Sequence, residues 1–163
     1  MTATGFNHVS VHATNLDESV RFYEDLFGME RIPTYDFGFP VQYLRLGELQ
    51  LHIFVRETSA PAYHHFGINV DNFEQVYLRA KQMGIHESKT FGHHIYELPD
   101  GTVQMYVRDP AGNIVEVDHP DVSTLDLDVI SDLKKLDDRV PQTGQALRSS
   151  LYNWRLPELA GRG

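Results

Sequence analysis

Residues 106–116 read Tyr-Val-Arg-Asp-Pro-Ala-Gly-Asn-Ile-Val-Glu, and this run decides how the chain is expected to fold. One strand is expected to end at Asp109 and a second strand to carry Glu116, with a tight turn over 110–113. Proline presets one turn residue, and Gly-Asn tolerates the positive φ angles that such a turn often needs. The run therefore predicts a β-hairpin whose second strand carries a carboxylate inward.

The hairpin closes the second copy of an internal repeat. Residues 8–16 (His-Val-Ser-Val-His-Ala-Thr-Asn-Leu) and residues 65–73 (His-Phe-Gly-Ile-Asn-Val-Asp-Asn-Phe) match at a constant offset of 57 residues. Each copy begins with the alternation that is typical of a half-buried strand. Asn15 and Asn72 then stand three residues before Glu or Gln, which is the capping-box spacing that starts a helix.

Each copy continues as a helix followed by strands. Apolar residues at helical spacing, each series followed by a glycine, predict helices that end at Gly28 and Gly84. Strands are expected over about 41–46, 49–55, 93–98, 102–108 and 113–118. The predicted fold class is α+β, with a βαβββ module occurring twice, over about 5–55 and 62–118. We expect these modules to form one domain, 1–118, followed by a helical C-terminal extension, 119–163.

Composition excludes several classes of protein. The 163 residues are enough to bury a core, and no apolar run approaches the ~20 residues of a membrane span. The N-terminal residues lack the charged and apolar regions of a signal peptide, so we expect a cytoplasmic protein that does not bind membranes. A formal net charge of −9 argues against a nucleic-acid partner. The chain has no cysteine, so any metal must be bound by nitrogen and oxygen ligands.

The candidate ligands are His8, His65 and Glu116. The two histidines occupy matching places in the repeat, and two imidazoles with one carboxylate make a facial metal triad. Glu116 stands between two valines, and a carboxylate in such a strand is costly to bury unless it is paired or bound to a cation. Three other histidines are expected at the surface or rim: His12, His86 and His119.

The chain resembles two-module members of the vicinal oxygen chelate superfamily, which includes glyoxalase I, epimerases, antibiotic-resistance proteins and type I extradiol dioxygenases. The resemblance covers about 5–118 and rests on Asn7-His8-Val9, on 65–72, and on Asp-Pro-Ala-Gly-Asn-Ile-Val-Glu at 109–116. It implies that the paired modules curl into an open barrel around one divalent metal bound by His8, His65 and Glu116. Coordination sites are then left for two substrate oxygens.

The choice between reactions depends on His52 and His94, whereas an aromatic residue at the place of Tyr106 is common to dioxygenases and glyoxalase-like members. The resemblance implies an acid–base histidine near His52 in an extradiol dioxygenase, which would use Fe(II) or Mn(II) and a catechol-like substrate. Tyr106 would hydrogen-bond the bound oxygen, and His94 would match a further catalytic histidine. Ten residues separate His94 from Met105, however, which is more than the family pattern has.

Two alternatives to the favoured dioxygenase stay open. A glyoxalase-type lyase or epimerase would bind Ni, Co or Zn, with His52 as a fourth ligand, and act on a 2-oxo or hydroxy compound. A metal-free antibiotic-binding protein is the third reading. Whether each site is built within one chain or shared between two copies is also open.

The tail is predicted to be helical and to help in dimer formation. Apolar residues at Leu125, Val129, Leu133 and Leu136 predict one amphipathic helix, and 146–154 a second short one. Exposed sheet edges and apolar tail residues favour association, and the resemblance also implies dimers. We therefore expect a homodimer.

Overall fold

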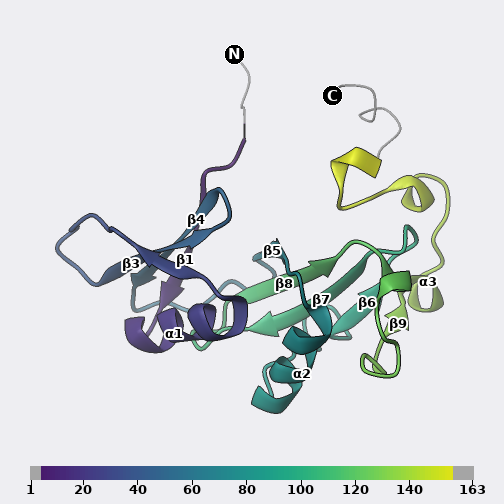
Figure 1. Cartoon of the computed structure of the whole chain (residues 1–163), viewed down its shortest axis with the longest axis horizontal. Helices are drawn as coiled ribbons and strands as arrows, with labels where there is room; N and C mark the ends of the chain where they lie inside the picture. The colour runs from purple at the N-terminus through teal and green to yellow at the C-terminus, as the bar shows by residue number, and fades with distance from the viewer. Residues whose placement is uncertain (1–4, 156–163) are drawn as a thin grey trace. The chain divides into compact units, whose positions relative to one another are not determined.

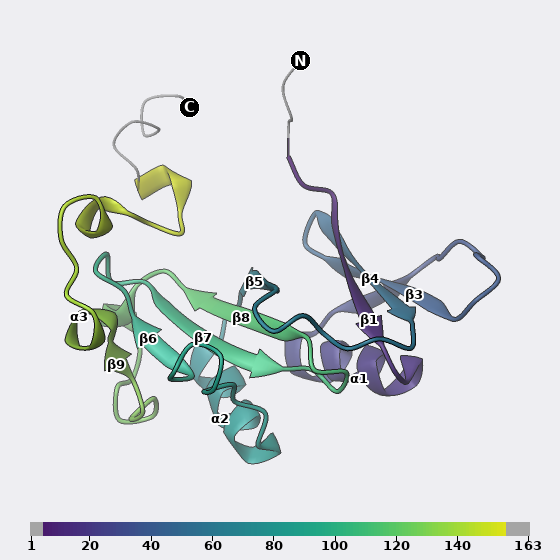
Figure 2. The ribbon, with the colours of Figure 1, turned by 180° about the vertical axis from the view of Figure 1, so that it is seen from behind.

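A computed structural model describes residues 5–155 of the chain, except for the side chain of Trp154 (Figures 1 and 2). The chain divides into two compact units, Met1–Phe66 with Arg108–Val115 and Gly67–Val107 with Glu116–Gly163. None of the helices in the described residues is long and apolar enough to cross a membrane.

The first sheet has four strands in the order β1-β4-β3-β2. Its elements in chain order are β1 (His8–Ala13), α1 (Leu16–Phe27), β2 (Glu30–Ile32), β3 (Val41–Leu46) and β4 (Leu49–Val55). β1 runs parallel to β4, and the other two pairings are antiparallel. The sheet is open, with β1 and β2 at its edges.

The second sheet has five strands in the order β5-β8-β7-β6-β9 and is also open. Its elements are β5 (His65–Asn69), α2 (Phe73–Met83), β6 (Ile95–Glu97), β7 (Val103–Arg108), β8 (Ile114–His119) and β9 (Lys134–Lys135). The order βαβββ thus occurs twice, and the predicted α+β fold class is confirmed.

The repeated helix signals act as the sequence predicts. The side chain of Asn15 accepts a hydrogen bond from the backbone N–H of Glu18 (3.2 Å), and Asn72 accepts one from Gln75 (3.0 Å). Both helices end at a glycine in the left-handed conformation, Gly28 (φ 64°) and Gly84 (φ 68°). Each cap satisfies backbone groups that the helix itself leaves without partners.

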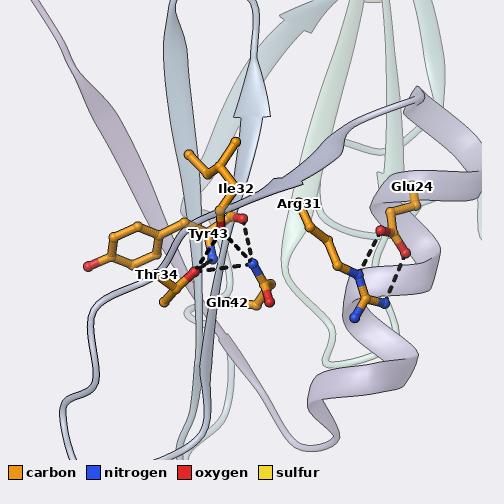
Figure 3. Close-up of polar contacts among 6 residues, drawn as sticks. All are labelled: Glu24, Arg31, Ile32, Thr34, Gln42 and Tyr43. Atoms are coloured by element: carbon orange, nitrogen blue, oxygen red, sulfur yellow. Dashed lines mark hydrogen bonds and ion pairs between the residues drawn. The ribbon is translucent and has the colours of Figure 1, made fainter.

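Helix α1 packs on one face of the first sheet. Strand alternation sends Leu51 and Ile53 of β4 to that face, where both side chains are buried. Arg31 of β2 reaches Glu24 of α1 through two hydrogen bonds of 2.8 and 3.1 Å, as Figure 3 shows. This ion pair is largely exposed, so burial of the apolar face contributes more to the packing.

Asp109 organises the predicted turn between β7 and β8. Its Oδ1 accepts the backbone N–H groups of Ala111 (3.0 Å) and Asn113 (2.8 Å). Its Oδ2 accepts the Asn113 amide (2.7 Å) and the hydroxyl of Tyr23 on α1 (2.8 Å). Gly112 has a φ of 86°, which favours glycine. The hairpin is confirmed, and one buried carboxylate fixes the turn to the first helix.

The predicted tail helix over 125–136 is wrong. Turns follow the 3₁₀ helix Val122–Thr124, then β9 pairs with β6, and α3 covers only Leu136–Arg139. The side chain of Asp126 accepts the backbone N–H of Asp128 (3.0 Å), and such local bonds compete with a helix. The second predicted helix, 146–154, is also wrong, since only the 3₁₀ turns Ala146–Arg148 and Asn153–Arg155 form. Residues 156–163 lie outside the described part.

Tyr23→Phe should lower the free energy of unfolding by about 1.5–3 kcal/mol, because the buried Asp109 carboxylate loses a charge-assisted hydrogen bond. Urea unfolding followed by circular dichroism measures the change. The exposed Tyr35 provides the matched control, since Tyr35→Phe should cost less than about 0.5 kcal/mol. Equal small effects of the two variants would show that the bond does not stabilise the turn.

Candidate metal and catalytic site

Three rings form a stack on the face of the first sheet opposite α1. The imidazole of His52 lies between the ring of His8, with centroids 4.3 Å apart and planes at 11°, and the ring of Tyr43, at 3.5 Å and 7°. Tyr43 on β3 is paired in register with His52 on β4. The structure thus brings together two of the predicted site residues, His8 and His52.

His52 is held in a defined orientation. Its side chain is buried (8% exposed), and Nε2 lies 2.9 Å from Oε1 of Gln50. Burial, and secondarily the charge of His8, lowers the pKa of His52 below its ordinary value of 6.5, so the ring is neutral at pH 7. Gln50 is itself paired in register with His8. Gln50 therefore lies directly opposite the predicted ligand His8, whereas His52 lies opposite Ser10.

The two predicted histidine ligands have similar contacts at Nδ1. In His8, Nδ1 lies 2.5 Å from Oδ1 of Asn7, and in His65, Nδ1 lies 2.9 Å from the carbonyl oxygen of Tyr63. Both side chains are exposed. In metal sites a ligating histidine commonly donates its second ring nitrogen to such an acceptor, which fixes the tautomer with its lone pair on Nε2.

Glu116 lies in a carboxylate cluster of the second unit. Glu116 and Asp118 project from the same face of β8, and both are buried. Burial, followed by the charge of Glu116 and a hydrogen bond to it, raises the pKa of Asp118 to about 8. Tyr106 also hydrogen-bonds Glu116, and its hydroxyl accepts the Gln104 amide at 2.5 Å. Burial, then Glu116, raises the pKa of Tyr106 well above 10.

Gly67 on β5 leaves room beside these carboxylates. A Cβ atom at that position would lie 2.9 Å from Oδ2 of Asp118 and 3.7 Å from Oε1 of Glu116. A cavity of about 490 Å³ opens here, and seven residues line it: Gly67, Asn69, Glu116, Asp118, Leu151, Tyr152 and Asn153. The second unit thus supplies a cavity with two neighbouring carboxyl groups, Glu116 and Asp118, on its wall.

Of the seven residues that line this cavity, only Glu116 was predicted from the sequence as a site residue, and Asp118, Asn69 and Tyr152 are the informative omissions. Asp118 could have been predicted, because it follows Glu116 by two residues and strand alternation therefore places both on one face. Asn69 and Tyr152 are joined by a hydrogen bond of 2.5 Å between residues 83 apart in the chain. No local pattern in the tail indicates that contact.

The donor set fits a cation. Oδ1 of Asp118 is buried and has no hydrogen-bond partner among the described residues, and two neighbouring buried carboxylates repel one another unless a proton or cation neutralises one. Within 5–155, no group of three or more His, Asp or Glu side chains is arranged to hold a metal ion. His8 and His65 belong to the first unit and Glu116 to the second, so the triad stays a prediction.

His94 belongs to a different cluster of the second unit. Its ring stacks on His86, with centroids 4.3 Å apart and planes at 13°, and its Nε2 lies 3.5 Å from Oδ2 of Asp132. Tyr77 of α2 donates its hydroxyl to the same carboxylate oxygen at 2.7 Å. The side chain of His94 therefore contacts His86 and Asp132, while its backbone carbonyl accepts the N–H of Tyr106 at 2.8 Å. Its catalytic role stays a prediction. His86, expected at the surface or rim, is instead half-buried.

Comparisons with known proteins agree with this architecture. The family model "Glyoxalase/Bleomycin resistance protein/Dioxygenase superfamily" matches residues 5–117. A lactoylglutathione lyase from Agrobacterium tumefaciens is 25% identical, with a TM-score of 0.55 over 72% of this chain and 95% of the other. A putative glyoxalase family protein from Bacillus anthracis is 24% identical (TM-score 0.58; 72% and 96% covered). The oxidase ChaP-H2 is 23% identical (TM-score 0.59; 74% and 97% covered). A comparison with curated protein sequences finds no significant match.

Acid should destabilise the cluster around His86. Burial, followed by the charge of His94, lowers the pKa of His86 to about 4, so the unfolded chain binds a proton between about pH 6.5 and 4 that the folded chain does not. Its contribution to stability is complete above pH 6.5 and is lost as the pH falls towards 4. The loss should be of order 1 kcal/mol, allowing for the partial exposure of the ring.

Urea unfolding of the parent and of His86→Phe at pH 7.0 and 4.5 measures this loss. The variant keeps a ring that stacks on His94 but cannot take up a proton, so its stability should fall less over the same interval. Parallel pH profiles for the two proteins would show that His86 does not titrate as inferred.

Proposed function

Because the chain belongs to the Glyoxalase/Bleomycin resistance protein/Dioxygenase superfamily, we propose that it is a metal-dependent enzyme that cleaves the ring of a catechol-like substrate. His8, His65 and Glu116 would bind one divalent ion, Fe(II) or Mn(II), and the substrate would approach it through two oxygens. The repeat supports this ligand set, as do the Nδ1 contacts of both histidines and the buried carboxylate pair around Glu116.

One observation favours ring cleavage over the other reactions of the superfamily. The ring of His52 lies directly against that of His8 and is fixed from its other side by Tyr43. An imidazole so placed can take a proton from a catechol hydroxyl and return it to the leaving oxygen. ChaP-H2, a protein of the same fold, is described as an oxidase, which is consistent with oxygen chemistry on this fold.

Tyr106 would orient the substrate. Its hydroxyl accepts the Gln104 amide and hydrogen-bonds Glu116, and its raised pKa keeps it protonated. It would donate its one hydrogen to a substrate oxygen once Glu116 binds the metal and releases the hydroxyl. When bound, Fe(II) or Mn(II) would supply the one-electron chemistry and the open positions that the reaction needs. His94 is left out of this set, because its side chain lies in the His86 and Asp132 cluster.

A glyoxalase-type lyase or epimerase is the second candidate, and Gln50 favours it. Gln50 is paired in register with His8. The resemblance to such enzymes implies a fourth ligand, Glu or Gln, on this strand. The ion would then be Ni, Co or Zn, and the substrate a 2-oxo or hydroxy compound. The similarity to a lactoylglutathione lyase supports this candidate.

We also propose that the protein forms a homodimer. Both sheets have open edges, and the tail exposes apolar side chains at Leu147 and Leu151. Such edges and apolar side chains are commonly covered in an assembly. A dimer would have about twice the chain mass of 18.7 kDa.

Glu116→Gln should abolish the binding of stoichiometric metal, because the amide is neutral and a weaker ligand than the carboxylate. Protein loaded anaerobically with Fe(II) and then desalted is analysed for metal content. Glu97→Gln is the matched control, since Glu97 lies in β6 of the same sheet and contacts Lys135. A variant at Glu116 that binds metal as tightly as the parent would disprove the triad. A parent protein that binds no metal would favour a metal-free binding protein.

His52→Phe separates the two reactions. In a dioxygenase the variant should keep its metal and lose about 10²–10⁴-fold in kcat, because phenylalanine can stack but cannot transfer a proton. Oxygen uptake with a panel of catechols gives kcat, and metal analysis gives occupancy, with His119→Phe as the control. In a lyase that uses His52 as its fourth ligand, His52→Phe should instead weaken metal binding, and in one that uses Gln50, Gln50→Leu should do so. Iron-loaded parent protein that consumes no oxygen with any catechol would favour the lyase.

A further inference from the structure

A series of aromatic rings leads away from His52 within the first unit. Phe54, two residues after His52 on β4, has its ring 6.1 Å away, and the ring of Phe39 lies 5.9 Å beyond it. Phe37 lies 6.3 Å from Phe54 and also 6.3 Å from Tyr35. We call the set the aromatic wall: Tyr35, Phe37, Phe39, Tyr43 and Phe54.

The aromatic wall is too exposed to be a core cluster. Tyr43 is buried beside His52, but Phe37 is 48% exposed and Tyr35 76% exposed. Contiguous exposed rings lose the benefit of burial that each could contribute, and such patches commonly mark binding surfaces. The buried Tyr43 beside His52 and the exposed Tyr35 and Phe37 are neighbours, with ring centroids 6.4 and 6.5 Å from Tyr43, so the exposed part of the wall adjoins the proposed site.

The loop that carries three of these rings is held at its base, as Figure 3 shows. Thr34 Oγ1 accepts the backbone N–H of Tyr43 (2.9 Å) and the Gln42 amide (3.1 Å), and its hydroxyl lies 3.1 Å from the carbonyl of Ile32. Near the tip, the side chain of Asp36 accepts the backbone N–H of Gly38 at 2.8 Å. These bonds fix the loop before any ligand binds, which reduces the entropic cost of binding.

The wall is also bounded. The guanidinium of Arg56 lies over the ring of Phe39, 3.7 Å from its centroid, and covers one face of that ring. At the other end the rings give way to the imidazoles of His52 and His8. The aromatic wall therefore ends at Arg56 on one side and at two polar imidazoles, which can accept protons, on the other.

We propose, building on the function proposed above, that the substrate carries its two chelating oxygens on a planar aromatic system of at least two rings, which stacks on the aromatic wall. The rings of the wall meet at angles from 22° to 83°, so they offer both faces and edges to a flat ligand. A single-ring catechol or a small 2-oxo compound would leave the outer rings uncovered. Continuity with His52 and His8 favours substrate over a second protein chain as the occupant.

Isothermal titration calorimetry of the Fe(II)-loaded protein, under anaerobic conditions, tests this inference with naphthalene-2,3-diol and catechol as probes. The diol should bind roughly tenfold more tightly, because its second ring adds apolar area against the wall. Phe37→Ser should remove most of this advantage while leaving catechol affinity and metal content within about twofold. Leu78→Ser on α2 is the control, since Leu78 is 51% exposed and outside the wall.

A ligand that cannot chelate separates this inference from the proposed function. 2,3-Dimethoxynaphthalene should bind the metal-free protein, and Phe37→Ser should lower its affinity. Both results are expected even if the metal triad is wrongly assigned. Equal affinities for the diol and catechol, with normal Fe(II) binding, would overturn the inference and leave the triad intact. It would also be overturned if Phe37→Ser halved the mass measured by light scattering without changing ligand affinity, because the wall would then be an interface between copies.

Discussion

Strand alternation against a helix-covered face is the constraint on which the rest of this structure depends. In β4, Leu51 and Ile53 are buried on the side that α1 covers, so Gln50 and His52 must project from the other side. Because the side-chain period is two, a slip of one residue in register would bury the amide and imidazole under α1. The apolar core of the first unit therefore positions its polar face.

The same constraint in the second unit has a cost. β8 sends Val115 and Val117 to one face, and the other face receives Glu116 and Asp118, which are buried side by side. Two carboxylates cannot both stay charged cheaply in such a place, and the pKa of Asp118 rises to about 8 as a result. A sequence that keeps this arrangement, with Gly67 leaving space beside it, retains a destabilising feature. Such features are common where a site must bind a cation.

Local signals were readable from the sequence, and long-range ones were not. The asparagine caps and the turn at Asp109 depend on residues within four positions of one another, and they form as predicted. The tail has helical apolar spacing, but β9 forms because β6 offers it an edge. That choice depends on tertiary structure, which overrides propensity.

The candidate site divides in the same way. Alternation places His8 and His52 on one face of their own strands, but their contact also depends on the pairing of β1 with β4, which no local pattern predicts. The stacking of His94 on His86 was not predicted from the sequence, because His86 is bridged to Val107, which is 21 residues away along the chain. Tyr152 reaches Asn69 across an even longer separation.

The hydrogen bonds of the histidines assign different roles to similar rings. Amide and peptide oxygens only accept, so Nδ1 of His8 and of His65 must each carry the hydrogen, and the lone pair of a neutral ring is on Nε2. In His52 the contact is reversed, because Nε2 donates to Gln50 and the lone pair is on Nδ1. Two rings thus have the tautomer that suits a ligand supported from its far side. The third has its proton-accepting atom on the opposite nitrogen, and proton uptake by His52 therefore falls to Nδ1.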